Sequence, residues 1–207
     1  MKTLVKKWMV LVLLAGALSF LQTACADEVA NPVTQLQTLI DSMQKDVAAQ
    51  HYTLQKNPDQ LYSLVKKNIM PDMAVDRMSA MALGPKWRTA TPAQRTEFVD
   101  QFSLMLTRAY ASALLKVNEY TITIFPLRGD EWKTADNLAL PGSIAQTGGG
   151  QASSVTYYVV REGNRWKIYD FAVEGVSIMN NFHTQLQSFP TMDAVLKRIK
   201  QVNSESL

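Results

Sequence analysis

The sequence predicts an α+β fold in which helices pack on a mainly antiparallel, four-stranded sheet. Apolar residues recur at helical spacing up to about residue 116, alternate with polar residues from Tyr120 to Glu174, and return to helical spacing after Ser177. Helices followed by a run of strands and then by more helices are typical of an α+β domain. There is no internal repeat or low-complexity block, so we expect one domain over residues 27–203.

The first 26 residues are predicted to be a secretory signal peptide. Three lysines fall within the first seven residues, the run from 8 to 21 is uncharged and mostly apolar, and Ala24 and Ala26 supply the small residues of a cleavage site. The apolar run is shorter than the roughly 20 residues that a membrane-spanning helix needs. Cleavage after Ala26 gives a mature chain that begins at Asp27.

The predicted leader contains the only cysteine of the chain, Cys25. The alternative is a lipoprotein signal with Cys25 lipidated, but Gln22 stands where such a signal has an apolar residue. Cleavage after Ala26 leaves no thiol, so the stability of the mature chain must come from its core. It also lowers the number of Lys and Arg from 21 to 18, equal to the 18 Asp and Glu, which argues against a basic surface for nucleic acid.

Three helices are predicted before the longest one. An apolar stripe at helical spacing indicates the first, and its members are Val33, Leu36, Leu39, Ile40, Met43 and Val47. Asn57 followed by Pro58 is typical of a helix start and predicts a second helix to about residue 68. A third is expected over residues 72–83, because Gly84 and Pro85 end it.

The longest helix is predicted over residues 92–116. Thr91 and Gln94 have the spacing of a capping box, with Pro92 at the first helical position. One side of this helix carries the apolar residues Phe98, Phe102, Met105, Leu106, Ala109 and Ala113. Leu104 and Leu115 point almost the opposite way. A helix that is apolar on two sides is covered on both, so we place it at the centre of the helical layer.

Period-two alternation and turn residues define the strands. They are expected over residues 120–127, 137–145, 153–161 and 165–174. The glycines of 147–150 predict a flexible connection, and residues 162–164 predict a hairpin turn.

The chain returns to helix after the fourth strand. Gly175 permits a sharp exit from the strand, and Ser177 is a good N-cap for the helix that follows directly. A last helix precedes a polar tail at 204–207, and its apolar stripe is Met192, Val195, Leu196, Ile199 and Val202.

The sequence offers no recognisable metal or nucleophile motif. His51 and His183 lie far apart without ligand spacing, so no metal site is indicated. The glycines of 148–150 lack the lysine and helix of a phosphate loop. Residues 175–177 resemble the start of a nucleophile elbow, but Met179 stands where glycine is required. A helix cap is the better interpretation of Ser177.

The residues alone leave two kinds of function open. Asp170 and Glu174 lie on a strand near aromatic residues, where a carboxylate can act as an acid or base in a small-molecule enzyme. A hydrogen-bonded structural aspartate is the more common outcome. The other alternative is an envelope interaction protein or chaperone that uses an exposed apolar patch.

Two sequence blocks, 83–95 (LGPKWRTATPAQR) and 166–177 (WKIYDFAVEGVS), carry a family resemblance. Together they are similar to the periplasmic toluene-tolerance family of Mla-pathway phospholipid-binding proteins. Met70-Pro71 and residues 192–196 also fit the family pattern. Phe182-His183 departs from it, because a tyrosine–arginine pair often stands there.

The resemblance implies a curved sheet and helices that enclose an apolar cavity for acyl chains. It implies a periplasmic shuttle, not an enzyme, that carries phospholipid between an outer-membrane lipoprotein complex and an inner-membrane ABC transporter complex, and so maintains outer-membrane lipid asymmetry. The expected cargo is phospholipid, with no cofactor, no metal and no nucleic acid, and the expected state is a monomer.

The residues expected to bind lipid come from the predicted helices and strands. The helix candidates are Met73, Met78, Phe102, Met105, Leu106 and Tyr110. The strand candidates are Ile122, Ile124, Val155, Tyr157, Val159, Ile168, Phe171 and Val173. Methionine suits surfaces that accept variable apolar ligands, and Met70, Met73, Met78 and Met81 cluster in the sequence. The sequence does not indicate which face of the sheet lines the cavity.

Overall fold

The computed structural model describes residues 29–205. The predicted signal peptide and Cys25 lie outside this range. None of the helices within it is long and apolar enough to cross a membrane.

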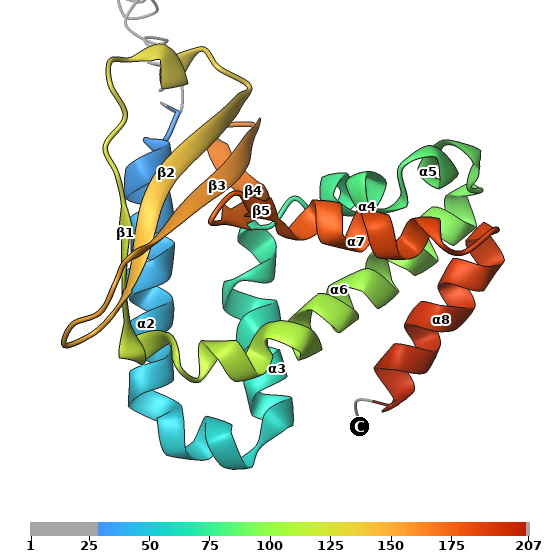
Figure 1. The fold of residues 1–207 in the computed structure, drawn as a ribbon, viewed down its shortest axis with the longest axis horizontal. Coiled ribbons are helices and arrows are strands. Elements are labelled where there is room, and N and C mark those ends of the chain that lie inside the picture. Colours follow the sequence, from blue (N-terminus) through green and yellow to red (C-terminus); the bar gives the residue numbers. More distant parts are fainter. Residues whose placement is uncertain (1–28, 206–207) are drawn as a thin grey trace, which may run out of the picture.

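Helices precede and follow one sheet, as the sequence predicts (Figure 1). The helices are α2 (Pro32–Lys56), α3 (Pro58–Asn68), α4 (Val75–Leu83), α5 (Pro85–Thr89), α6 (Pro92–Leu114), α7 (Ile178–Gln187) and α8 (Met192–Glu205). Short 3-10 turns are η1 (Met70–Asp72), η2 (Val117–Glu119) and η3 (Glu131–Lys133). The strands are β1 (Tyr120–Ile124), β2 (Asn137–Gln146), β3 (Ser153–Glu162), β4 (Arg165–Val173) and β5 (Val176–Ser177). The α+β class is confirmed, and α8 includes the first two residues of the predicted polar tail.

The sheet is an antiparallel meander in the order β1-β2-β3-β4-β5, with five strands rather than the four expected. The extra strand arises because Glu174 and Gly175 both adopt positive φ, at 49° and 79°. Such a two-residue turn matches the twist of a hairpin and brings Val176 opposite Val173. The chain therefore pairs once more with β4 before α7 begins, and the prediction of a direct passage from strand to helix was wrong in this detail.

A β-bulge in β4 determines which side chains share a face. Tyr158 lies opposite Asp170 and Val159 lies opposite Ile168, so Tyr169 has no partner on β3. Since Phe171 lies opposite Tyr157, Ile168 and Phe171 point to the same face although they are three residues apart.

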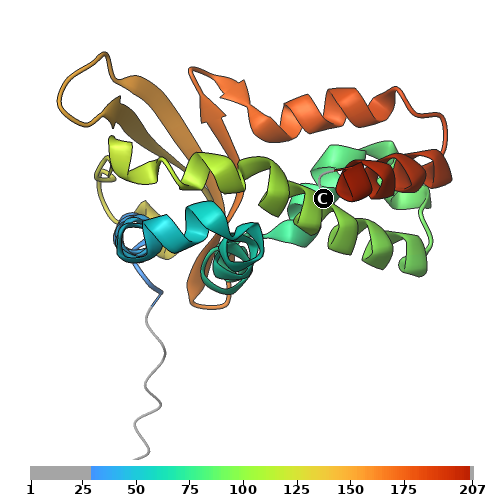
Figure 2. The ribbon, with the colours of Figure 1, turned by 90° about the horizontal axis from the view of Figure 1, so that it is seen from below.

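Helix α6 lies at the centre of the helical layer, as predicted. The capping box is present, because Gln94 N donates to Thr91 Oγ1 at 3.2 Å and Thr91 N donates to Gln94 Oε1 at 3.0 Å. Phe98 and Phe102 are fully buried in a cluster that includes side chains of α8. Seen from below, α6 runs along the molecule between the α2–α3 pair and α7 (Figure 2).

The predicted helix over 72–83 is shorter than expected. Met73 pairs with Ile168 in an isolated parallel bridge, and Ala74 N donates to Ile168 O at 2.8 Å. These contacts hold Met73 extended along β4 and keep Ala74 out of the helix, so α4 begins only at Val75. The short helix α5 follows Gly84 and was not predicted.

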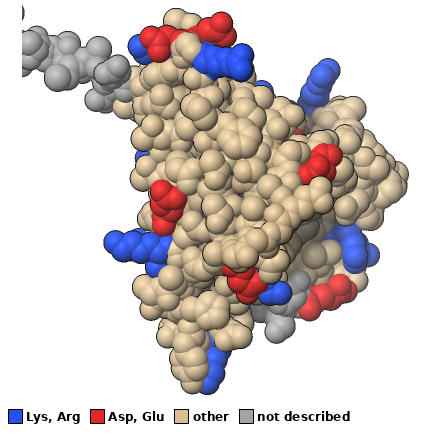
Figure 3. Space-filling model, turned by 60° about the vertical axis from the view of Figure 1, so that its left-hand side comes forward, with Lys and Arg blue, Asp and Glu red and all other residues tan. Residues whose placement is uncertain are grey.

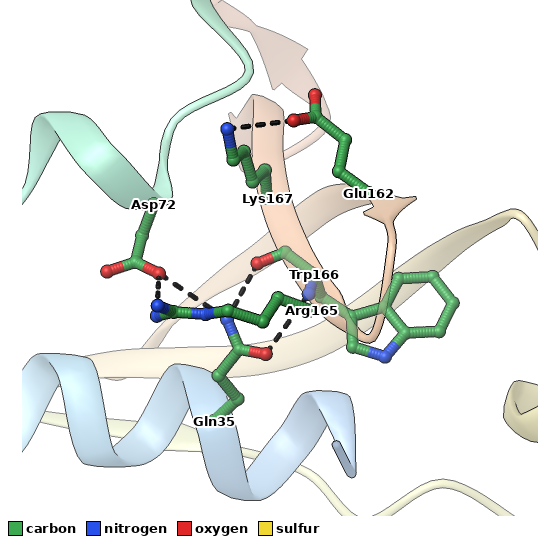
Figure 4. Close-up of polar contacts among 6 residues, drawn as sticks. All are labelled: Gln35, Asp72, Glu162, Arg165, Trp166 and Lys167. Carbon is green, nitrogen blue, oxygen red and sulfur yellow. Dashed lines mark hydrogen bonds and ion pairs between the residues drawn. The ribbon is translucent and has the colours of Figure 1, made fainter. Parts of the chain in front are cut away.

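Helix α2 satisfies backbone groups at both edges of the sheet. The Gln35 amide donates to Trp166 O at 2.7 Å and accepts from Trp166 N at 3.0 Å (Figure 4). The Gln37 amide pairs in the same way with Ile122 O and Ile124 N on β1. Beside the Gln35 contact, Arg165 forms an ion pair with Asp72 at 2.7 Å. Helix α2 therefore spans from one sheet edge to the other and covers polar groups that an open edge exposes.

Candidate binding cavity

A cavity of about 500 Å³ lies between the helices and the sheet. Its wall comes from α2, α3, α4, α6 and α7, and from strands β1 to β4. Among its 23 lining residues there is no Asp, Glu, Lys, Arg or His. The polar side chains in the wall are Thr107, Tyr110, Tyr120 and Tyr157. This volume and this lining suit a ligand that is mostly hydrocarbon.

Eight of the fourteen residues expected to bind lipid line this cavity. They are Met73, Met78, Leu106, Tyr110, Ile122, Tyr157, Ile168 and Phe171. The β4 bulge explains why Ile168 and Phe171 both belong to the wall, and it shows which face of β4 the cavity uses.

The other six candidates do not line this cavity. They are Phe102, Met105, Ile124, Val155, Val159 and Val173. Phe102 stacks on Phe98 with ring centroids 5.3 Å apart, because the first turns of α6 lie against α8 beyond the end of the cavity. Ile124 and Val159 are buried in the cluster that joins α2 to the sheet.

Fifteen wall residues were not among the candidates. They are Leu36, Leu39, Ile40, Met43, Val65, Ile69, Met70, Thr107, Ala113, Leu114, Val117, Tyr120, Ile144, Ile178 and Met179. The largest omission is helix α2, whose stripe was recognised only as a buried face. The run Leu36, Leu39, Ile40 and Met43 spans two turns of one helix face, and this continuity was the available signal.

Two tyrosines and a phenylalanine form an aromatic group in the wall. The Phe171 ring on β4 lies 6.4 Å from the ring of Tyr110 on α6 and 6.4 Å from the ring of Tyr157 on β3, measured between centroids. Burial raises the pKa of Tyr157 to about 12 and also raises the pKa of Tyr110, because loss of water disfavours the phenolate. Both phenols therefore stay neutral donors at ordinary pH.

The carboxylates considered as catalysts lie outside the cavity wall. Asp170 accepts hydrogen bonds from Ser177 Oγ at 2.6 Å and from Met179 N at 3.0 Å. Glu174 accepts from Ser154 N at 2.6 Å. His183 Nδ1 lies 3.1 Å from Met81 O. Within residues 29–205, no group of three or more His, Cys, Asp or Glu is placed to hold a metal ion.

The fold and the cavity define a class of protein: an α+β shell with a preformed, uncharged apolar chamber. The sequence model of the MlaC protein family matches residues 37–202. The chain belongs to this family.

Relatives and a solved structure agree with this assignment. The chain is 26% identical to the intermembrane phospholipid transport system binding protein MlaC of Haemophilus influenzae, over 85% of this chain and 82% of that one. It is 28% identical to the toluene tolerance protein ttg2D of Pseudomonas putida, over 68% and 64% of the two chains. The phospholipid-binding protein of Ralstonia solanacearum, solved in complex with a phospholipid, has the same fold, with a TM-score of 0.75, 22% identity, and coverage of 86% and 99%.

Proposed function

We propose that this protein is a periplasmic phospholipid carrier that holds acyl chains in its cavity. The observation that carries the proposal is the cavity of about 500 Å³ with no charged residue in its wall. The MlaC relative of Haemophilus influenzae is named for intermembrane phospholipid transport, and the structural neighbour was solved with a phospholipid. The periplasmic location follows from the predicted signal peptide.

The physical task of such a carrier is to keep acyl chains out of water. Exposing a chain costs roughly 0.8 kcal/mol for each CH2, so a chain of about 15 methylenes costs about 12 kcal/mol. A carrier overcomes this barrier when its cavity offers nearly the same free energy as the bilayer. Loading and release then need no covalent chemistry, only docking at a membrane complex that can accept the lipid.

The proposed route runs between an outer-membrane lipoprotein complex and an inner-membrane ABC transporter complex, and keeps the outer membrane asymmetric. The surface is compatible with transient docking. On the side that carries α2 and β1, Lys and Arg alternate with Asp and Glu, and the charges are widely spaced (Figure 3). On this side there is no strong field of one sign that would hold the carrier on anionic lipid.

The cavity favours binding over catalysis. Among the described residues, its wall has no ionisable group other than tyrosine. Asp170 and Glu174 do not line it, and each accepts a hydrogen bond from a backbone amide. A general base has to reach its substrate within hydrogen-bond distance. We therefore infer transport of an unmodified lipid.

The test is whether the protein carries phospholipid. The full chain with its leader is expressed in a Gram-negative host, purified from the periplasm and examined by native mass spectrometry. We expect a complex whose added mass is that of phospholipid. A protein that arrives empty and takes up no lipid from phosphatidylethanolamine–phosphatidylglycerol vesicles would overturn the proposal.

A pair of neighbouring substitutions on β2 makes this test specific to the cavity. Ile144 lines the wall, while Ser143 points to the opposite face of the sheet. Ile144→Glu places a carboxylate without a counter-charge among acyl chains, so we expect lipid loading to fall at least tenfold. Ser143→Glu adds the same charge outside the cavity and should load like the wild type.

A further inference from the structure

Four of the described residues in the cavity wall have polar side chains, namely Thr107, Tyr110, Tyr120 and Tyr157. The hydroxyl of Thr107 donates to Ser103 O, one turn back in α6, at 2.9 Å. Tyr120 is 38% exposed, so its ring reaches the surface. Tyr110 and Tyr157 remain as the polar groups that belong to the interior of the wall.

These two phenols have no hydrogen-bond partner in the part of the chain that the structure describes. Both rings lie against the ring of Phe171, with centroids 6.4 Å from it in each case. Partial burial raises the pKa of each tyrosine, because desolvation disfavours the phenolate. In a cavity without lipid, a water molecule can accept the hydrogen bond of a phenol. Acyl chains displace that water, and a buried donor without an acceptor is costly.

A filled cavity therefore needs an acceptor at this point of its wall. The acyl chains of a diacyl phospholipid end in ester groups, whose carbonyl oxygens accept hydrogen bonds and donate none. A phenol donates, so the two chemistries match. The charged head group does not fit here, since the wall offers it no opposite charge.

We propose that Tyr110 and Tyr157 form a subsite for the ester carbonyls of the bound phospholipid, with Phe171 as the spacer between them. This rests on the proposed function and assigns a polar anchor within it. Hydrocarbon alone can slide along an apolar wall, whereas a hydrogen bond from Tyr157 on β3 or Tyr110 on α6 fixes the depth of the chains. The carrier then distinguishes ester-linked from ether-linked lipid.

The distinguishing experiment is a competition between two lipids with the same head group and the same chain length. Vesicles contain equal amounts of diester and diether phosphatidylethanolamine, and native mass spectrometry gives the bound ratio for each protein. The cost of leaving the bilayer is common to all variants, so only the change in ratio between variants is interpreted. One neutral hydrogen bond corresponds to about a threefold to tenfold change.

We expect the ratio of bound diester to bound diether lipid to be several-fold higher in the wild type than in the double variant Tyr110→Phe, Tyr157→Phe. Each single variant should fall between the two. The control is Tyr158→Phe, the next residue on β3, whose ring contacts Tyr169 and does not line the cavity. It should keep the wild-type ratio. An unchanged ratio in the double variant, with lipid still bound, would overturn the subsite while leaving the carrier function intact.

A second measurement covers the case in which a variant folds poorly. Phospholipid labelled with carbon-13 at the ester carbonyls is loaded into the wild type and into whichever single variant melts normally. We expect the infrared carbonyl band of the wild-type complex to lie at lower frequency, as a hydrogen-bonded ester requires. Identical bands at the frequency of a free ester would also refute the subsite. If the wild type loads neither lipid, the proposed function itself fails.

Discussion

The carboxylate of Asp170 on β4 accepts a hydrogen bond of 3.0 Å from the backbone N–H of Met179, which lies in the first turn of α7. Asp170 is only 4% exposed, and Ser177 Oγ donates to its other oxygen. Ser177 in turn caps the helix by accepting from Asn180 N at 2.9 Å. A negative group at a helix N-terminus pairs an otherwise free amide and is favoured by the helix dipole. This contact fixes α7 on the sheet, and α7 supplies Ile178 and Met179 to the cavity.

Replacing Asp170 should therefore weaken the fold. Asp170→Asn keeps the shape but removes the charge and turns one acceptor into a donor, so we expect a loss of about 1–3 kcal/mol in the free energy of unfolding, measured with urea. Glu174→Gln is the control, since its exposed side chain still accepts from Ser154 N, and it should change stability by less than about 0.5 kcal/mol. A folded Asp170→Asn that matches wild-type stability would refute the capping role.

The sequence predicts the local features of this fold well. The capping signals at Asn57, Thr91 and Ser177 all mark helix starts, because a cap depends only on residues three or four positions apart. The non-helical residues Met73 and Ala74 were misassigned for the opposite reason. Their conformation is set by bonds to Ile168, far along the chain, which no local pattern reveals.

The cavity wall was predicted only in part, and one bulge accounts for much of the difficulty. Strict alternation along β4 would place Ile168 and Phe171 on opposite faces. The unpaired Tyr169 reverses the alternation and brings them together. Helix α2 was missed because an apolar stripe looks the same whether it faces packed side chains or a chamber. Its Leu36 does both, since it belongs to a core cluster and to the cavity wall.

The two hydrogen bonds between the Gln35 side chain and the Trp166 backbone, together called the Gln35 clamp, should help to attach α2 to the sheet. Gln35→Met keeps a similar length but leaves the amide and carbonyl of Trp166 without the bonds that Gln35 provides. We expect a loss of about 1–3 kcal/mol in unfolding free energy and faster hydrogen exchange at the Trp166 amide, seen by NMR. Thr38→Ala, at an exposed position of the same helix, is the control and should leave that exchange rate unchanged. Equal exchange in Gln35→Met and wild type would contradict the clamp.

Gly142 on β2 is needed because β1 comes too close for a side chain. A Cβ at this position would lie 2.4 Å from the backbone oxygen of Thr123, which cannot rotate away. Gly142→Ala should therefore force the two strands apart and cost about 1–3 kcal/mol, with a lower melting temperature by circular dichroism. Ser143→Ala tests the neighbouring position and should melt close to wild type. A stable Gly142→Ala would show that β1 shifts without cost.

The raised pKa of Tyr157 predicts how stability depends on pH in the alkaline range. The folded protein holds this proton up to about pH 12, whereas a tyrosine in the unfolded chain loses it near pH 10. Between these values the unfolded state binds fewer protons, so stability is complete below pH 10 and is lost as pH rises toward 12.

The variant Tyr157→Phe isolates this contribution from the other tyrosines and the lysines. We expect its urea midpoint to fall less than the wild-type midpoint between pH 9 and about pH 11.5, with Tyr158→Phe behaving like wild type. In the variant, absorbance at the phenolate band should show one tyrosine fewer than in the wild type among those that lose their proton well above pH 10. Parallel pH profiles for Tyr157→Phe and wild type would mean that water reaches this phenol in the folded protein, because only a solvated phenolate forms near its ordinary pKa.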